Sequence, residues 1–120
     1  MNKKLNIVNK MKKKFNIGIL GVGRISKKHI LAIHKNNSFF RILALCDTKI
    51  KKLDTKLKVL KFNSINQMLK NNLKFDLISI CTPSGLHKSH AIQCLKKGIN
   101  VLIEKPMALT FEEAENMIYA

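Results

Sequence analysis

The amino-acid sequence predicts an α/β fold, a doubly wound parallel sheet with helices on both of its faces. Two observations predict it. From residue 14 onward, short apolar runs alternate with segments whose apolar residues follow the helical repeat, a pattern typical of β-α-β units. The apolar runs are also continuous, as expected of strands that are buried on both faces. A chain of 120 residues has room for one domain with a single modest core, which we place at residues 14–120.

Five apolar runs are the expected strands of this sheet. In chain order they cover residues 15–20, 41–46, 58–62, 75–81 and 100–103. The third run is the weakest of the five. Three of the others are followed by residues that end a strand: Gly21, Asp47 and the pair Thr82-Pro83.

Segments with helical periodicity separate and follow the strands. In chain order these are residues 24–36, a short segment at 49–57, and three helices with the apolar faces Ile65/Met68/Leu69, Leu86/His90/Ala91/Cys94/Leu95 and Phe111/Ala114/Met117/Ile118. Ser64 and Thr110 are placed to cap two of these helices, and Glu113 completes a capping box with Thr110. Gly98 lies where a helix C-cap glycine belongs.

Residues 1–13 are Lys-rich and show no clear period, which predicts a disordered basic arm. Either Met1 or Met11 begins the natural chain. No apolar run reaches about 18 residues, so the sequence predicts no membrane span, and no apolar stretch follows the basic start as a secretory signal requires. The three cysteines lack paired metal-ligand spacing. We expect reduced, buried thiols, no metal site and a cytoplasmic location.

The formal net charge of +16 raises the question of nucleic-acid binding. The composition argues against it, because 21 of the 23 basic residues are lysines and only two are arginines, whereas arginine makes most bidentate phosphate and base contacts. The chain has no Trp and one Tyr, so aromatic platforms for stacking bases are scarce. We expect no nucleic-acid partner and attribute the lysines to a compositional bias shared with Asn and Ile.

A glycine motif joins the first expected strand to the first helix: Gly21-Val22-Gly23-Arg24-Ile25-Ser26. The first glycine permits a tight turn, and the second lets a pyrophosphate approach the backbone. The helix N-terminus then offers N–H groups and a partial positive charge. Ser26 stands where a third Gly or Ala is usual. The motif predicts a dinucleotide site of the Rossmann type, with Gly21, Gly23, Arg24 and Ile25 at the cofactor.

Asp47 ends the second strand, 24 residues after Gly23. A carboxylate at this place accepts hydrogen bonds from the adenosine ribose hydroxyls and repels a 2′-phosphate, so NAD is favoured over NADP. The alternative is an aspartate that only caps the next segment. Lys49, Lys51 and Lys52 lie close by and keep NADP possible.

Four blocks of sequence resemble the N-terminal domain of the glucose–fructose oxidoreductase / inositol dehydrogenase (Gfo/Idh/MocA) family. They are GVGRISKKH (21–29), ALCD (44–47), SICTPSGLHKSHA (79–91) and NVLIEKPMALTFEEAENMI (100–118). The resemblance extends from about residue 14 to the end of the chain. The Glu-Lys-Pro run after the fifth expected strand is its most specific part.

The resemblance implies a role for each residue that matches the family pattern. Thr82 and Pro83 would flank the cofactor near its nicotinamide half, and His87 would line the same cleft. Glu104 would hold the nicotinamide ribose. Lys105 would reach the reacting carbinol or carbonyl, and its catalytic role is supported by its position at the carboxyl end of a strand.

Pro106 fixes the backbone that aims Lys105, through a peptide bond that is often cis in the family. His90 is assigned to helix packing, and His29 and His34 receive no role.

The family implies an oxidoreductase that moves a hydride between a nicotinamide cofactor and a sugar, cyclitol or nucleotide-sugar hydroxyl. It also implies a second, larger domain that supplies the substrate contacts, a further acid/base pair and the oligomer interface, and this sequence does not contain it. We therefore expect a fragment or split subunit that binds cofactor without turnover. The alternative is a non-catalytic nucleotide-binding module or partner subunit.

The expected strand order leaves the fifth strand uncovered, because a complete fold of this type has six strands in the order 3-2-1-4-5-6. An open edge of this kind exposes unpaired backbone groups. We expect marginal stability and self-association through this edge.

Overall fold

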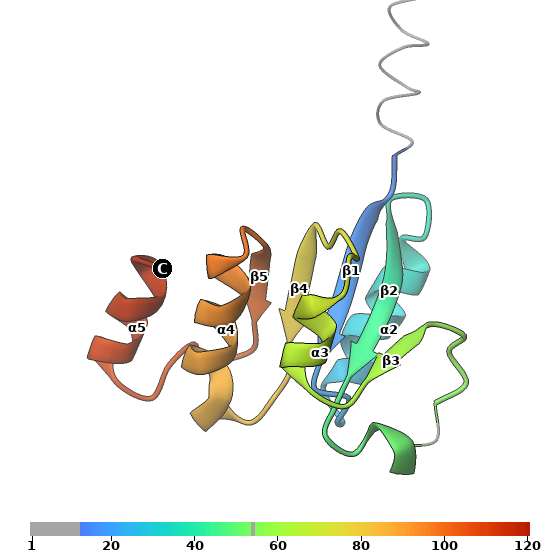
Figure 1. The fold of residues 1–120 in the computed structure, drawn as a ribbon. Coiled ribbons are helices and arrows are strands. Elements are labelled where there is room, and N and C mark those ends of the chain that lie inside the picture. Colours follow the sequence, from blue (N-terminus) through green and yellow to red (C-terminus); the bar gives the residue numbers. More distant parts are fainter. Residues whose placement is uncertain (1–12, 54) are drawn as a thin grey trace, which may run out of the picture.

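The computed structural model describes residues 13–53 and 55–120, and it shows the predicted doubly wound α/β fold (Figure 1). The expected basic arm at residues 1–13 lies outside the described residues except for its last position. Five parallel strands form one sheet in the order β3-β2-β1-β4-β5. The strands are β1 (Phe15–Leu20), β2 (Phe40–Cys46), β3 (Leu60–Phe62), β4 (Leu77–Ile80) and β5 (Asn100–Ile103).

The helices cover the two faces of the sheet unequally (Figure 1). They are α2 (Ser26–Lys35), α3 (Ile65–Lys70), α4 (His87–Lys96) and α5 (Phe111–Ile118). On one face α3, α4 and α5 bury Met68, Ala91, Cys94 and Met117 in a common core. On the other face α2 packs Ile33 against a second, smaller core. Both cores are needed because parallel strands expose apolar side chains on both sides of the sheet.

The helix ends follow the sequence signals. Ser64 caps α3, since its hydroxyl oxygen accepts a hydrogen bond from the N–H of Gln67 at 3.2 Å. Thr110 caps α5 by accepting from the N–H of Glu113 at 3.1 Å. The Glu113 carboxylate accepts in return from the N–H of Leu109 at 3.0 Å, one residue before the cap. Gly98 follows α4 with a φ of +75°, the left-handed conformation that closes a helix.

The helix expected at residues 49–57 is wrong. Among the described residues of this segment, only Ile50–Lys52 is helical, as a single 3₁₀ turn. Lys49, Lys52 and Lys56 are spaced three and four residues apart, so a helix would bring like charges together on one face. No side chain caps this 3₁₀ turn, and no acidic residue stands at its start. The two signals that stabilise a helix N-terminus are therefore both missing, and nothing offsets the repulsion between the lysines.

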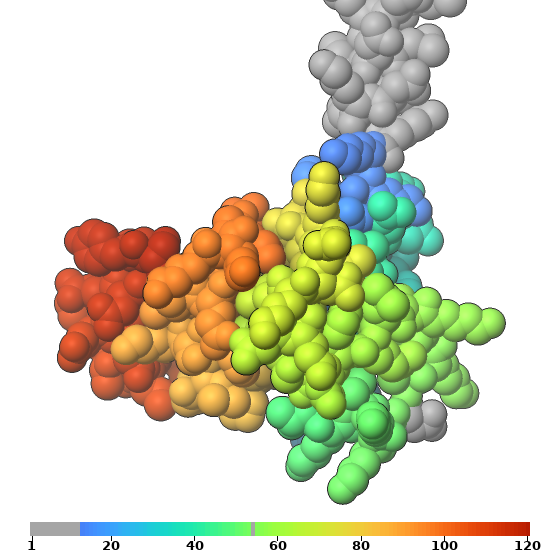
Figure 2. Space-filling model, viewed as in Figure 1, coloured from blue at the N-terminus to red at the C-terminus, as the bar shows by residue number. Residues whose placement is uncertain are grey.

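The apolar face expected for α5 is only partly buried. Met117 is 3% exposed, but Phe111 is 79% and Ile118 is 71% exposed. Figure 2 shows α5 at one end of the molecule, where it packs against α4. Leu102 of the edge strand β5 is also half exposed, because no helix of the described chain covers that face of β5. Leu86 departs from its expected helical face as well, since it lies exposed in the 3₁₀ turn Ser84–Leu86.

The three cysteines are free and buried, as expected for reduced thiols. Burial, together with the neighbouring Asp47 and Cys94, raises the pKa of Cys46 to about 12. Burial raises the pKa of Cys94 to about 11. Both thiols are therefore protonated at neutral pH. No helix in the described part of the chain has the length and hydropathy to cross a bilayer.

Candidate dinucleotide site

The sequence-predicted site residues lie together at the carboxyl edge of the sheet. Because the strands are parallel, the segments that follow β1, β2, β4 and β5 emerge at this one edge. Backbone hydrogen bonds join them directly: the Gly21 N–H donates to the Cys46 carbonyl at 2.8 Å, and the Cys81 N–H donates to the Leu20 carbonyl at 2.7 Å. The Glu104 N–H donates to the Ile80 carbonyl at 3.2 Å, so the end of β5 lies beside the end of β4.

Gly21 lies where the chain leaves β1 and crosses the end of β4. Its φ is +90°, and an added Cβ would stand 2.7 Å from both the Cys81 carbonyl carbon and the Thr82 nitrogen. Both neighbours are backbone atoms and cannot rotate away. Only glycine fits this position, for its conformation and for the close approach of the two segments.

Gly23 and the start of α2 present unused backbone donors. Nothing lies within 4 Å of a Cβ built on Gly23, so the loop is open on that side. The N–H groups of Gly23, Arg24 and Ile25 donate to no acceptor among the described residues. No side chain caps α2 and no acidic residue stands in its first turn. An anion at this terminus would meet free N–H groups and the positive end of the helix.

Ser26 explains how the motif tolerates the loss of its third glycine. The side chain is completely buried, and its hydroxyl donates to the Gly23 carbonyl at 2.6 Å. The hydroxyl is thus satisfied inside the turn, and its small size preserves the close contact of helix and strand.

Asp47 already accepts a hydrogen bond from the backbone of the glycine loop. Its Oδ2 accepts from the Val22 N–H at 2.8 Å, and its Oδ1 accepts from the Lys49 N–H at 2.8 Å. The second of these bonds holds the backbone at Lys49, the residue before the 3₁₀ turn, so Asp47 supports the local backbone without capping that turn. A carboxylate has about four acceptor positions, so capacity remains for ribose hydroxyls. The two roles are therefore compatible.

His87 is placed inside the protein rather than on the surface of the cleft. It is 1% exposed. Its Nε2 lies 2.7 Å from the Thr82 carbonyl and its Nδ1 lies 2.8 Å from the Pro106 carbonyl. Both partners are acceptors, so a doubly protonated ring makes both bonds and a neutral ring makes one. The ring thus links the two loops that flank the edge, and its expected place in the lining of the cofactor cleft stays a prediction.

His90 has a polar partner as well as a packing role. Its Nδ1 lies 3.0 Å from the Thr82 hydroxyl. Burial lowers the pKa of His90, and the neighbouring His87 lowers it further. In a neutral ring Nδ1 accepts a hydrogen bond from the Thr82 hydroxyl, and this bond holds the Thr82 side chain at the end of β4.

Glu104 is held by a histidine that the sequence analysis left without a role. Nε2 of His29, on α2, lies 2.5 Å from Oε1 of Glu104. Nδ1 of His29 lies 2.5 Å from the hydroxyl of Ser79, which is buried in β4. The available signal was weak: Ser79 interrupts an apolar strand, and His29 falls on the sheet-facing side of α2.

Lys105 and Pro106 follow β5. The Lys105–Pro106 peptide bond is cis, as the resemblance implied. The side chain of Lys105 is exposed, and its ammonium donates to no acceptor among the described residues. Its ammonium is therefore available to a ligand at the carboxyl edge.

Acid should remove one specific contribution to stability. The hydrogen bond from His29 lowers the pKa of Glu104 below its ordinary value of 4.5, assisted by Lys105 and opposed by burial. A carboxyl group with a lowered folded-state pKa stabilises the protein above its unfolded pKa and loses this effect as the pH falls through the folded value. The melting temperature of Glu104→Gln should therefore lie below that of the unaltered chain at pH 7, and the difference should shrink below about pH 4.5. A constant difference between pH 7 and pH 3 would contradict this.

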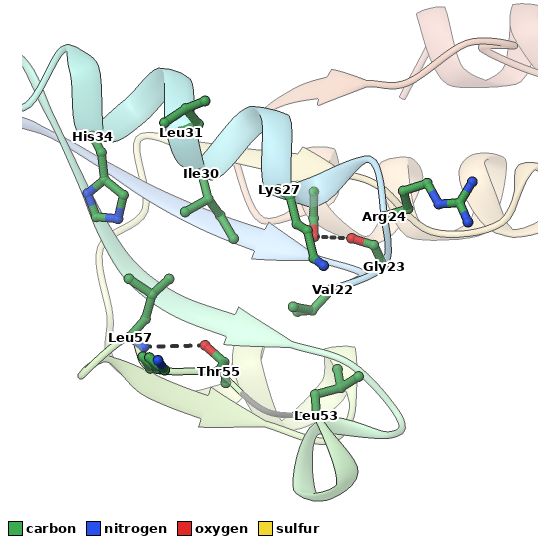
Figure 3. Close-up of a pocket in the computed structure, with 12 residues that line it drawn as sticks. Val22, Gly23, Arg24, Lys27, Ile30, Leu31, His34, Leu53, Thr55 and Leu57 are labelled. Atoms are coloured by element: carbon green, nitrogen blue, oxygen red, sulfur yellow. Dashed lines mark hydrogen bonds between the residues drawn. The ribbon is translucent and has the colours of Figure 1, made fainter.

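A pocket adjoins the glycine loop on the α2 side of the sheet (Figure 3). Its volume is about 810 Å³. It is lined by Val22, Gly23, Arg24, Ser26, Lys27, Ile30, Leu31, His34, Leu53, Thr55, Lys56 and Leu57. The pocket shares the glycine loop with the edge described above but extends along α2, and Lys105 and Glu104 are not part of it. Arg24 points away from the other labelled side chains in Figure 3, toward the carboxyl edge.

The described residues match a family of known proteins. Residues 15–120 match the model of the Gfo/Idh/MocA oxidoreductase family, described as having an NAD-binding Rossmann fold. The chain belongs to this family. The match covers all the strands, the glycine loop and the Glu-Lys-Pro run, so the resemblance noted from the sequence is confirmed.

Solved and curated members of the Gfo/Idh/MocA family support the same assignment. The WlbA dehydrogenase of Bordetella pertussis, solved in complex with NADH and UDP-GlcNAcA, is 34% identical with a TM-score of 0.84 over 89% of this chain and 33% of that one. D-glucoside 3-dehydrogenase of Escherichia coli K12 is 26% identical over 84% of this chain and 30% of its own length. The NADP-dependent scyllo-inositol 2-dehydrogenase IolW of Bacillus subtilis is 43% identical, over 39% of this chain and 13% of its length.

This Gfo/Idh/MocA chain spans about a third of the length of the first two of these relatives, and it corresponds to their NAD(P)-binding part. The match does not extend over the remaining length of those two proteins.

Proposed function

We propose that this chain is the NAD-binding domain of an oxidoreductase that transfers a hydride between the nicotinamide cofactor and a hydroxyl group of a sugar, cyclitol or nucleotide sugar. The observation that carries the proposal is the open start of α2. There the unpaired N–H groups of Gly23, Arg24 and Ile25 adjoin Asp47, at the edge where Glu104 and Lys105 also emerge. This combination of an anion site, a ribose acceptor and a free amine suits a dinucleotide better than a mononucleotide.

The residues present fit the dinucleotide along its whole length. Gly23 and the α2 terminus would hold the pyrophosphate, and Arg24 would add charge at its exposed side. Asp47 would accept from the adenosine ribose. Thr82, Pro83 and Pro106 would border the nicotinamide half, with His87 fixing both loops from behind.

The bound nicotinamide ring would supply the hydride donor or acceptor. Glu104 would accept hydrogen bonds from the nicotinamide ribose hydroxyls. Lys105 would donate to the substrate oxygen and hold a proton there, which stabilises the charge that develops on this oxygen during the transfer.

Turnover would require, besides these 120 residues, a substrate-binding part of the kind expected in the remaining length of the relatives, of which the match covers about a third. We expect the chain alone to bind cofactor without oxidising a sugar. The 34% identity to a dehydrogenase solved with UDP-GlcNAcA, together with the TPSGLH loop, favours a nucleotide-linked amino sugar as the substrate of the assembled enzyme. Three free buried thiols favour the cytoplasm as its compartment.

A second candidate is a nucleotide-binding module or partner subunit without catalysis. Its support is the completeness of the cofactor edge in a chain that spans a third of its relatives. Mixing the chain with a separately produced substrate domain of a relative distinguishes the two. Regained dehydrogenase activity that Lys105→Ala abolishes supports the split enzyme, whereas cofactor binding that never leads to turnover supports the module.

A cofactor-dependent rise in melting temperature tests the binding function. A ligand that binds only the folded state stabilises it by about 2.7 kcal/mol at about 100 times its Kd, which corresponds to a shift of several degrees for a domain of this size. NADH should produce the shift at millimolar concentration and in 0.15 M salt. If neither NADH nor NADPH shifts the melting temperature, both dinucleotide functions are rejected. A shift of the melting temperature produced by nucleic acid alone would favour nucleic-acid binding instead.

Asp47 should set the choice of cofactor. Asp47→Asn removes the charge and keeps its oxygen as the acceptor for the Val22 N–H, while the exposed Lys49 N–H loses its partner to water, so the loop should remain folded. Loss of a charged hydrogen-bond acceptor costs about 1.5–3 kcal/mol, and we expect NADH affinity to fall about tenfold or more. NADPH affinity should rise, because the repulsion of its 2′-phosphate is removed and Lys49 lies close by. Titrations of both cofactors measure the ratio, and an unchanged NADH/NADPH ratio would contradict the assigned role.

A further inference from the structure

A row of polar side chains crosses the α2 face of the sheet and ends at the cofactor edge. Ser79 on β4, His29 on α2 and Glu104 after β5 are joined by two hydrogen bonds of 2.5 Å each. The three residues come from three separate elements. Among the described residues, the bond between His29 and Glu104 is the only hydrogen bond that joins a side chain of α2 to a side chain of the segment after β5.

The hydrogen-bond roles in this row are fixed by chemistry. An ionised Glu104 only accepts, so Nε2 of His29 carries a hydrogen and donates to it. In a neutral ring Nδ1 then accepts, and the Ser79 hydroxyl donates to it. Every group is satisfied by one tautomer of the neutral ring, so the row has one preferred arrangement.

The exposed fraction of the side chains increases along the row, from Ser79 to Glu104. Ser79 is 1% exposed, while the side chains of His29 and Glu104 are 14% and 25% exposed. A serine, a histidine and an acid in this order resemble a hydrolytic triad, but the serine is at the buried end and cannot meet a substrate. The accessible end is the carboxylate. The row therefore anchors an acceptor at the surface rather than activating a nucleophile.

Resting on the proposed function, we infer that His29 is a positioning residue for the nicotinamide half of the cofactor site. It holds the Glu104 carboxylate against α2, so that the remaining acceptor positions of that carboxylate face a ribose bound at the end of β5. His29 itself touches no ligand. It also ties Glu104 to the helix whose N-terminus would bind the pyrophosphate, so the two halves of the site share one rigid element.

The inference predicts a loss that depends on which half of the ligand is present. ADP reaches the glycine loop and Asp47 but lacks the nicotinamide ribose, whereas NADH spans both halves. His29→Leu should weaken NADH binding about threefold to tenfold, because Glu104 would lose its fixed orientation and part of its bonding to the ribose, and it should leave ADP binding unchanged. His29→Gln, whose amide nitrogen can replace Nε2 as donor, should restore most of the NADH affinity.

Two comparisons separate positioning from general damage. His34→Leu makes the same change on an exposed face of α2 and should alter neither affinity. In a Glu104→Ala background His29→Leu should cause no further loss, because the residue through which it acts is gone. Circular dichroism melts of each variant establish that the fold is retained.

Calorimetric titration of NADH and ADP into these variants decides the question. A selective NADH loss that His29→Gln reverses supports the positioning role. Equal losses for NADH and ADP, no loss for either, or a full effect of His29→Leu without Glu104 would each overturn it while leaving dinucleotide binding intact. If the unaltered chain binds neither ligand, the proposed function fails, and the positioning role falls with it.

Discussion

Replacing Gly21 with alanine is expected to unfold the domain or come close to it. The added Cβ would stand 2.7 Å from two backbone atoms at the end of β4, at a φ of +90°. The left-handed backbone costs about 1–2 kcal/mol for a residue with a side chain, and overpacking costs about 1–3 kcal/mol. The sum of about 2–5 kcal/mol is a large fraction of the stability of a small domain. Urea unfolding followed by circular dichroism measures the loss.

Gly23→Ala is the matched control, two residues further on in the same loop. No atom lies within 4 Å of its added Cβ, and its φ is not in the left-handed region. Stability should change by less than about 1 kcal/mol, but the methyl group would occupy the space that a pyrophosphate needs, so NADH affinity should fall. If Gly21→Ala were as stable as Gly23→Ala, the close crossing of β1 and β4 would not be what requires a glycine there.

The 120-residue chain is expected to self-associate through β5 and α5. The edge strand exposes half of Leu102, and α5 and its C-cap residue Tyr119 expose Phe111, Ile118 and Tyr119 at 79%, 71% and 86%. Together they offer an unpaired strand edge beside an apolar surface. The net charge of +16 opposes association, but its long-range part is screened at 0.15 M salt. Sedimentation velocity at increasing protein concentration should therefore show species larger than a monomer.

Adding charge to that surface should reverse the association. Leu102→Lys combined with Ile118→Lys should shift the sedimentation distribution toward monomer. Phe39→Lys with Leu31→Lys adds the same charge at two other half-exposed apolar positions and should leave it unchanged. A monodisperse monomer with a cooperative melt above about 60 °C, the upper range for ordinary domains, would contradict the claim that the exposed edge causes self-association and low stability.

Local sequence signals correctly predicted the elements whose formation depends only on residues nearby in the chain. The strand at residues 15–20, the caps at Ser64 and Thr110 and the turn at Gly98 depend on neighbours within a few residues, and the structure confirms them. The strand order was expected from the dinucleotide-binding fold that the glycine motif indicates, and the structure confirms it for the five strands present.

Features that depend on distant partners were not predictable in the same way. Phe111 and Ile118 have the right spacing for a buried face, but burial requires a covering element, which the described chain does not provide. His87 matched a motif, yet its partners are carbonyl groups 5 and 19 residues away. His29 meets Glu104 across 75 residues of sequence, and no local pattern indicates such a pair. Motif matching found the residues of the candidate site, but the structure was needed to separate those at its surface from those that hold them.

The central claim is that the carboxyl edge of the sheet binds a nicotinamide dinucleotide, and amide chemical shifts during an NADH titration test it most directly. The account predicts saturable changes at Gly23, Arg24 and Ile25, with further changes at Thr82 and Glu104, all persisting at 0.15 M salt. Changes spread over the lysine-rich surface and removed by salt, or no changes at millimolar NADH, would contradict it.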